Sequence, residues 1–450
     1  MPTLEWIGKK AVVGHHREVP YRLLHCNGKL SAGDADAGNL LVQGDNLLAL
    51  KALLPYYAGK VKCIYIDPPY NTGNEKWIYN DAVNSQEMRS WLGKVVGAEA
   101  EDLSRHDKWL CMMYPRLCLL RDFLTDDGVL FVSIDDNEFH YLRCLMDEVF
   151  SPRNWLCTLI WKRRQTPDSR NVNGVSADHE YIFTYSRSGK TRFVGQGKDL
   201  SKYSNPDNDP LGPWMSDNLT GLADANERPN LHYDVVNPKT GTRYPPHSSR
   251  GWIYGPERMQ LLMKDGRILW PKSAKGRPRL KRYLSDMKAE TTGFSTMLDA
   301  KANVAGTKEL LRLFGEKAFA FPKPTDLVRI LVEQVTDPDS LVLDSFAGSG
   351  TTGHAVLALN KADGGRRRFV LVEMEPDIAE RVTGERLRMA VEGYGSEPAL
   401  GGGFRFCALG EPLFDEAGNI RESVKFCDLA AHVFFTETGS PIPRGCPIHS

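Results

Sequence analysis

Four residues in the first third of the chain could activate a poorly reactive amino group. Asp67-Pro68-Pro69-Tyr70 directly follows the apolar run Val61–Ile66. The amino group of an aromatic base is a weak nucleophile because its lone pair is conjugated into the ring. The Asp67 carboxylate and the Pro68 carbonyl, which has rigid neighbours, could each accept one N–H and free that lone pair. The Tyr70 ring could stack on the base, a contact worth about 1–3 kcal/mol.

The same four residues are also compatible with a strand that ends in an Asp and a Pro-Pro turn. The catalytic interpretation therefore depends on what else the chain carries. No covalent nucleophile is required, since most of the acceleration would come from aligning the amine with a methyl donor.

A second set of residues could bind a nucleotide-like ligand. Val342–Asp344 reads as a strand, Phe346-Ala347-Gly348-Ser349-Gly350 as a tight turn, and Thr351 as the start of a helix. Glycines let a ligand approach the backbone, and a helix start offers N–H donors. The next apolar run ends at Glu373, an acidic residue suited to ribose hydroxyls.

Three interpretations of this turn remain open to different degrees. Thr351 and Thr352 follow Gly350 where a phosphate loop needs Gly-Lys-Ser/Thr, which argues against that loop. The spacing Gly348-x-Gly350-x-x-Gly353 matches a dinucleotide fingerprint, and Glu373 lies about 20 residues beyond it. A plain strand-to-helix turn is the third possibility. The turn alone does not identify its ligand.

Two regions alternate strands and helices, which predicts a parallel sheet with helices on both faces. The first has strands at 39–42, 61–66 and 129–134 and helices at 47–54, 109–124 and 137–150; the second has helices at 326–336 and 351–359 and strands at 341–343 and 369–372. Neither region has enough strands for a doubly wound sheet. We therefore expect one domain from 1–150 and 319–400, interrupted by an insert at 151–318. Residues 401–450, after three glycines, are expected to form a C-terminal appendage.

The insert carries excess positive charge. The chain has 57 Lys+Arg and 57 Asp+Glu, but Ser151–Glu290 has 24 against 14, a net charge of +10. Such a segment in an otherwise acidic protein is a candidate anion-binding surface. Basic side chains could contact phosphates or guanine edges, although a solvated loop is the alternative for any single one. The candidates are Arg163, Arg277, Arg279, Lys281 and Arg282. Trp161, beside the first of them, could brace a base or pack in the core.

Composition argues against several classes of protein. No run of about 18 apolar residues is present, and the first ten residues lack the pattern of a secretory signal. The nine cysteines are scattered, without a Cys-x-x-Cys pair. We therefore expect a cytoplasmic protein with reduced thiols, no metal site and no membrane contact.

Taken together, these strings resemble the beta class of DNA amino-methyltransferases, in which the catalytic motif precedes the cofactor motif, as Asp67 precedes Phe346. The segment from Asp344 to Thr351 is similar to the S-adenosylmethionine motif of that class. Phe319-Ala320-Phe321-Pro322-Lys323-Pro324 resembles its aromatic-x-x-Pro-Lys-Pro segment, and Gly44-Asp45-Asn46 resembles its segment near the cofactor adenine. The resemblance runs from about residue 35 through nearly the whole chain. It is closest to modification subunits of type III restriction–modification systems and their orphan relatives.

This resemblance implies a Rossmann-like methyltransferase sheet of circularly permuted motif order, with an inserted target-recognition region. It implies that S-adenosylmethionine is bound by Asp45, Lys323, Asp344, Phe346, Gly348, Gly350, Thr351 and Glu373. A simple helix N-cap is an equally good interpretation of Asp45.

The reaction implied is methylation of adenine N6 in a base flipped out of duplex DNA. Asp rather than Ser at position 67 favours adenine over cytosine. A homodimer and a separate restriction subunit are implied as partners. Three alternatives stay open: a cytosine-N4 methyltransferase, a catalytically idle DNA-binding or assembly subunit, and methylation of RNA or protein.

Overall fold

The computed structural model describes residues 3–72, 105–169, 173–247, 249–273 and 275–441. It divides into two compact units. Unit 1 comprises Met1–Val194 and Phe294–Ser450, and unit 2 comprises Gly195–Gly293. Across the described ranges, no helix is both long and apolar enough to cross a membrane.

Unit 1 is built on a ten-stranded sheet. In spatial order its strands are β1 (Arg22–Gly33), β17 (Gly403–Pro412), β2 (Leu40–Gln43), β16 (Arg368–Glu373), β15 (Leu341–Asp344), β3 (Val61–Ile66), β4 (Leu124–Ile134), β6 (His179–Ser186), β5 (Trp155–Lys162) and β14 (Met297–Leu298). From β17 to β4 all neighbours are parallel, whereas β1 and β6 run antiparallel to their partners. The central strands are short continuous apolar runs because both of their faces are buried. The predicted α/β class is confirmed.

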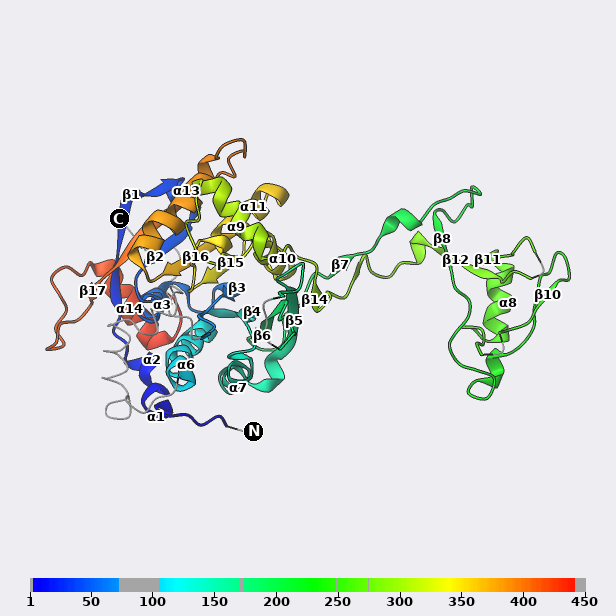
Figure 1. Cartoon of the computed structure of the whole chain (residues 1–450), viewed down its shortest axis with the longest axis horizontal. Coiled ribbons are helices and arrows are strands. Elements are labelled where there is room, and N and C mark those ends of the chain that lie inside the picture. The colour runs from blue at the N-terminus through cyan, green and yellow to red at the C-terminus, as the bar shows by residue number, and fades with distance from the viewer. Residues whose placement is uncertain (1–2, 73–104, 170–172, 248, 274, 442–450) are drawn as a thin grey trace. The chain divides into compact units, whose positions relative to one another are not determined.

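Helices cover both faces of this sheet (Figure 1). Side chains alternate along β3, so Ile64 and Ile66 join one core and Cys63 and Tyr65 the other. The first core also takes residues from α3 (Asn46–Tyr57), α6 (Arg105–Phe123) and α7 (Phe139–Phe150); the second takes residues from α10 (Thr325–Val335), α11 (Thr351–Asp363) and α13 (Glu385–Glu392). Within the described residues, the other α-helices of unit 1 are α1 (Lys9–Val12), α2 (His15–Glu18), α9 (Asn303–Phe314), α12 (Pro376–Ile378) and α14 (Phe426–Thr438).

One edge of the sheet collects the ends of seven strands. β2, β16, β15, β3 and β4 run parallel, so their carboxyl ends meet there, the usual ligand-binding position of such sheets. β6 runs the opposite way, and Tyr181 pairs with Ile134, so the start of β6 reaches the same edge. β5 reverses again, and Trp161 pairs with Glu180. This edge positions the residues of the site described below.

Unit 2 is smaller than the predicted insert of residues 151–318. β5, β6 and β14 lie inside that range but extend the sheet of unit 1 beyond β4. Their apolar residues are buried only when these strands pair with that sheet. The separate unit, green in Figure 1, has its own core and a three-stranded sheet of β11 (Ile268–Leu269), β12 (Arg279–Tyr283) and β8 (Trp214–Asp217). Its core residues are Leu219, Val235, Trp252, Met259, Leu262, Ile268 and Leu280.

The short elements of unit 2 complete the order of the chain. They are β7 (Gln196–Gly197) paired with β13 (Thr291–Thr292), β9 (Val235–Val236) paired with β10 (Arg243–Tyr244), and the helix α8 (Pro256–Lys264).

The predicted C-terminal appendage also differs, because β17 lies inside the main sheet between β1 and β2. Gly403 starts this strand, and a Cβ there would lie 2.2 Å from the backbone nitrogen of Asp34. Glycine is required for this close approach of two backbones rather than for a hinge.

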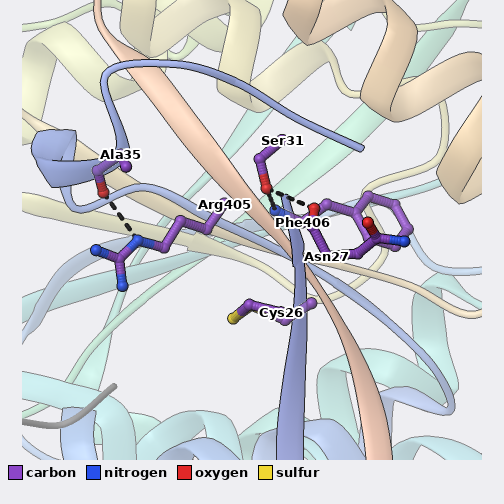
Figure 2. The surroundings of a disulfide bond; sticks show 7 residues. Cys26, Asn27, Ser31, Ala35, Arg405 and Phe406 are labelled. Carbon is purple, nitrogen blue, oxygen red and sulfur yellow. Dashed lines mark hydrogen bonds between the residues drawn. A yellow bond between two sulfur atoms is a disulfide. The ribbon is translucent and has the colours of Figure 1, made fainter. Parts of the chain in front are cut away.

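Cys26 and Cys407 form a disulfide across β1 and β17, which corrects the expectation of reduced thiols. The two residues are directly opposite in the antiparallel register, with Cα atoms 3.9 Å apart. Figure 2 shows neighbouring contacts, in which Ser31 donates to the Asn27 carbonyl and accepts from the Phe406 amide. The sequence separation is 381, so spacing along the chain gave no sign of the pair.

Of the two positions considered for Trp161, the structure shows the one in the core. It is 0% exposed in the second core, and its indole N–H donates to the Lys301 carbonyl at 3.1 Å. It therefore does not brace a base.

We predict that Trp161→Ala lowers the free energy of unfolding by about 3–5 kcal/mol, because it leaves a large cavity in the core. Urea denaturation followed by far-UV circular dichroism measures this. Trp155 lies on the same strand, is 39% exposed, and should cost much less when changed to Ala. Equal losses for both variants would contradict the assignment of Trp161 to the core.

Candidate active site

Asp67, Tyr70 and Lys323 form a hydrogen-bonded group at the sheet edge where the carboxyl ends of the parallel strands meet. The Lys323 Nζ lies 2.8 Å from Asp67 Oδ1 and 2.7 Å from Oδ2. The Tyr70 hydroxyl donates to Asp67 Oδ1 at 2.8 Å, and Lys323 donates to the Tyr70 oxygen at 2.9 Å. Lys323, predicted to bind a cofactor, thus places its amine on the predicted catalytic carboxylate.

Glu180 extends this group. Its Oε2 lies 3.0 Å from the Tyr70 hydroxyl and 3.4 Å from Lys323 Nζ. Its Oε1 accepts from Arg163 Nη1 at 3.1 Å. Arg163 also donates to the Ala177 carbonyl, so the arginine predicted to contact DNA lies beside the catalytic group. Sequence reasoning gave Glu180 no role, although it starts an apolar strand as Asp67 ends one.

Burial controls the charges of these groups. It raises the pKa of Asp67 above its ordinary value, while Lys323 and the Tyr70 hydroxyl lower it and Glu180 raises it. Burial lowers the pKa of Lys323, but the two carboxylates outweigh burial and the net shift is upward. Burial and both carboxylates hold the pKa of Tyr70 well above its ordinary value, so its hydroxyl stays protonated.

The turn that carries Asp67 and Tyr70 is held in place by hydrogen bonds to residues of other segments. The Trp109 indole donates to the Pro69 carbonyl at 2.6 Å. Asn71 has a φ of +56°, a conformation that few non-glycine residues adopt, and its amide donates to Arg105 O and to the buried Glu138. Prolines at 68 and 69 fix their own φ angles. The position of Asp67 is therefore set by several contacts.

A cavity of about 320 Å³ opens beside this group. Its polar walls include Asp67, Glu180 and Lys323. Its other walls are partly aromatic and come from Tyr70, Phe319 and Phe321. The residues completing the lining are Thr72, Asp135, Arg163, Asn303 and Ala320. The arrangement suits a flat ring that carries hydrogen-bonding groups on one edge.

The glycine turn forms a second pocket next to the first. Gly348 and Gly350 have φ angles of +51° and +78°, and a Cβ on Gly350 would lie 3.1 Å from Thr383. The pocket is lined by Phe346, Gly348 and Thr351 among others, and shares Asp67, Phe319, Phe321 and Lys323 with the larger cavity. The Thr351 hydroxyl donates to the Lys323 carbonyl at 3.1 Å, which ties the turn to the catalytic group.

Asp344 lies under the turn. Its carboxyl accepts from the Phe346 amide at 2.9 Å and from the Thr352 hydroxyl. Burial, the largest effect, raises its pKa from an ordinary 3.8 to about 7 despite these two hydrogen bonds. Asp344 thus shapes the turn and lines its pocket.

Two acidic residues predicted to hold the cofactor bind the protein itself. Glu373 is 1% exposed and accepts from the Gly348 amide at 2.7 Å and the Glu375 amide at 3.0 Å. Asp45 caps α3 through the Leu47 and Leu48 amides and pairs with the buried Arg116 at 3.0 Å. The helix-cap interpretation of Asp45 is therefore realised in the structure; a cofactor role for either residue remains a prediction.

Arg386, which sequence reasoning missed, supports the turn from behind. It is 0% exposed and donates to Ser349 O at 3.2 Å and Thr351 Oγ1 at 2.9 Å. Burial lowers its pKa to about 10, so it remains charged at neutral pH. Its helix, α13, carries no motif, and only the packing of that helix brings it to the turn.

The basic cluster of unit 2 divides into exposed and buried members. Arg277, Arg279 and Arg282 are exposed. Lys281 is 8% exposed and pairs with Asp207 and Asp209, the latter at 2.6 Å. Lys281 thus supports the fold of unit 2, and we remove it from the predicted DNA contacts.

Comparison with known proteins gives consistent matches. A family model described as DNA methylase matches residues 61–383. The chain is 35% identical to the type III restriction-modification enzyme StyLTI Mod subunit of Salmonella typhimurium strain LT2, over 79% of this chain and 55% of that protein. It is 31% identical to the EcoPI Mod subunit of Escherichia phage P1, over 84% and 64%. It is also 31% identical to the type II methyltransferase M.KpnI of Klebsiella pneumoniae, over 78% and 84%. The chain therefore spans just over half of the StyLTI Mod subunit and just under two thirds of the EcoPI Mod subunit.

We predict that Asp344→Asn changes how stability depends on pH. A carboxyl whose pKa rises on folding binds its proton more tightly when folded, so its contribution to stability is lost as pH rises from about 4 through 7. The unfolding temperature of the variant should therefore improve relative to the parent as pH rises from about 4 to about 7, and the difference should level off above that. Asp339→Asn, an exposed change before the same strand, should follow the parent; a constant difference for Asp344→Asn would contradict the prediction.

Proposed function

The chain belongs to the DNA methylase family, and on this premise we propose that it transfers the methyl group of S-adenosylmethionine to adenine N6 in duplex DNA. The observation that carries the proposal is the position of Asp67. Its carboxylate lines both the large cavity and the pocket of the glycine turn. An amino group held by Asp67 would therefore face a ligand held by the turn.

In the proposed mechanism, this chain holds and orients the amine. Asp67 accepts one N–H; among its described contacts, Oδ2 accepts from Lys323 and retains an acceptor position. The Pro68 carbonyl would accept the second N–H, since the Pro69 carbonyl is already bonded to Trp109. The aromatic side chains that line the cavity would stack on the ring of the base and fix its orientation. Both acceptors are preorganised, so little rearrangement opposes the reaction.

The residues around the turn fit S-adenosylmethionine. When bound, that cofactor supplies an electrophilic methyl group on a cationic sulfur. Asp344 and Asp67 offer negative charge for this cation, and the start of α11 at Thr351 offers N–H donors for a carboxylate. The conformation of Gly350 lets a ligand approach the backbone closely. A dinucleotide does not account for Asp67 and its partners beside the same turn.

Adenine is preferred over cytosine only because Asp stands at position 67. The amino edges of both bases present an N–H donor beside a ring-nitrogen acceptor, so the cavity admits cytosine as the second candidate. An idle subunit is disfavoured because the Asp67 group is complete, with both oxygens and the Tyr70 hydroxyl hydrogen-bonded.

The exposed arginines of unit 2 support duplex DNA as the substrate. Unit 2 contains 16 Lys and Arg against 11 Asp and Glu, a net charge of +5. Exposed positive charge of this kind binds phosphates and releases counterions. We further propose a cytoplasmic homodimer that acts alongside a separate restriction subunit, because related Mod subunits carry restriction-modification enzyme names.

The direct test of this function is long-read sequencing of DNA from cells that express the chain. It reports the modified base and its sequence context together. N6-methyladenine at one recurring sequence is the expected result; N4-methylcytosine, or no modified base, would overturn the proposal in favour of its alternatives.

We predict that Asp67→Ala lowers methyl transfer at least about 100-fold, the scale of one preorganised hydrogen-bonding group. Affinity for S-adenosylmethionine should change little, because the residues of the turn remain in place. Incorporation of labelled methyl groups and isothermal titration calorimetry measure the two effects. Asp67→Asn, which keeps the size of the side chain, controls for packing; a parental rate in both variants would refute this role.

We also predict that Arg279→Ala and Arg282→Ala each weaken DNA binding and reduce its salt dependence by about one unit of slope. Fluorescence anisotropy across a salt series measures this. Lys239→Ala, an exposed lysine of unit 2 outside the cluster, is the matched control. Unchanged slopes for both arginine variants would remove this strand from the interface.

Lys281→Met should instead lower the thermal stability of unit 2, because it leaves Asp207 and Asp209 without the ammonium group of Lys281.

A further inference from the structure

Two carboxylates meet at one hydroxyl in the active site. The Tyr70 oxygen lies 2.8 Å from Asp67 Oδ1 and 3.0 Å from Glu180 Oε2. A phenol carries one hydrogen, so at any moment it donates to only one of them. Lys323 donates to the same oxygen at 2.9 Å. A proton on the Asp67 oxygen beside Tyr70 can therefore cross to Glu180 without a change in the position of Tyr70 or Glu180.

The proposed reaction requires such a transfer. As the bond between carbon and the cationic sulfur breaks, its electron pair stays on sulfur and the amine nitrogen bonds to the methyl carbon. The nitrogen then carries a positive charge until it loses one of its two hydrogens. Asp67 accepts that N–H and is the first base for the proton. The Asp67 side chain is 22% exposed and lines the cavity, where a bound base would cover it, so the proton needs a second acceptor before the next turnover.

We propose that Glu180 is this second acceptor and receives the proton through Tyr70. The protonated Asp67 carboxyl first turns about its Cβ–Cγ bond, so that the oxygen bearing the proton lies beside the Tyr70 oxygen. Asp67 then gives this proton to the Tyr70 oxygen while the Tyr70 hydroxyl gives its own proton to Glu180 Oε2. One O–H bond breaks and one forms at the phenol, so Tyr70 ends as it began. This inference rests on the proposed methyltransferase function.

The surroundings of Glu180 lead outward from the reacting atoms. Its other oxygen binds Arg163, whose side chain is 23% exposed against 4% for that of Glu180. The pairing of Trp161 with Glu180 in neighbouring strands sets Arg163 at this position. Arg163 has no acceptor position and takes no proton; it holds the Glu180 carboxylate beside the cavity that both residues line, and the proton leaves Glu180 through that cavity.

Lys323 limits the electrostatic cost of the transfer. Its Nζ lies 2.7 Å from Asp67 and 3.4 Å from Glu180, so the negative charge stays beside the same cation whichever carboxylate is ionised. The titratable and charged groups that surround Glu180 and Asp67 are Tyr65, Tyr70, Asp135, Arg163, Lys323 and Asp344. Asp135 is the rival acceptor, since it lines the same cavity; its described hydrogen bonds come from Asn137.

The test compares Glu180→Gln and Tyr70→Phe with the parent in multiple-turnover methylation of the DNA site found by sequencing, because the transfer prepares Asp67 for the next turnover. Each variant should lower the plateau rate by about 100-fold, a typical contribution of acid–base groups. The double variant should be no slower than the slower single variant, because both changes interrupt one path. Added formate or imidazole should raise the rate of Glu180→Gln and leave the parent unchanged.

Two measurements separate proton transfer from positioning. Fluorescence of 2-aminopurine at the target position, which reports base flipping, and S-adenosylmethionine affinity should match the parent within about twofold in Glu180→Gln. Asp147→Asn is the matched control, because Asp147 accepts from a tyrosine, Tyr185, at 2.6 Å and from an arginine, Arg143, at 3.1 Å outside the cavity. It should keep the parental rate.

Several outcomes would overturn the inference. Glu180 raises the pKa of Asp67, so in a purely electrostatic role its neutral variant should shift the acid limb of the pH–rate profile to lower pH and leave the plateau intact. A loss of 2-aminopurine signal in Glu180→Gln would assign Glu180 to positioning. The full effect in Asp135→Asn instead would transfer the role to Asp135. A parent that methylates no DNA would overturn the proposed function together with this inference.

Discussion

The ion pair between Lys323 and Asp67 is the contact on which the rest of the site depends. The two residues are 256 positions apart, yet the amine lies on both carboxylate oxygens. The backbone carbonyl of Lys323 accepts the Thr351 hydroxyl, so one residue sets the distance between the catalytic carboxylate and the glycine turn. Desolvating a buried ion pair is costly, and such a pair is poor evidence for stability. Its value here lies in geometry and in opposing the rise that burial causes in the pKa of Asp67.

The sheet makes this contact possible. β15 lies beside β3, although the two strands are far apart in the sequence. The strand order explains this, because β15 and β16 of the second α/β region lie between β3 and β2. Parallel pairing then brings every carboxyl end to one edge. The two antiparallel strands that follow β4 add Glu180 and Arg163 to the same edge. Unit 2 enters the chain between β6 and β14 and contributes no strand to this sheet.

Sequence reasoning succeeded where the physical signal is local. Apolar runs bounded by turns located the central strands and the helices that follow them, and the Asp-Pro-Pro-Tyr and glycine strings lie at strand ends. It failed where tertiary packing determines whether a side chain is exposed or buried. Lys281 looked like its exposed neighbours until Asp207 and Asp209, more than 70 residues earlier, enclosed it. For Trp161 the sequence left a core position and a contact with a base both open, and the pairing of β5 with the sheet decides for the core.

The sequence by itself determined the class of fold, the order of the motifs and the residue types available for chemistry. These follow from hydrophobic periodicity and from short strings whose conformations are fixed by glycine and proline. Only the tertiary structure decided which of these side chains meet. Glu180, Arg386 and the Cys26–Cys407 pair carry no local signature, because their partners lie between 17 and 381 residues away. Long-range pairing of strands brings them together, and spacing along one chain does not encode it.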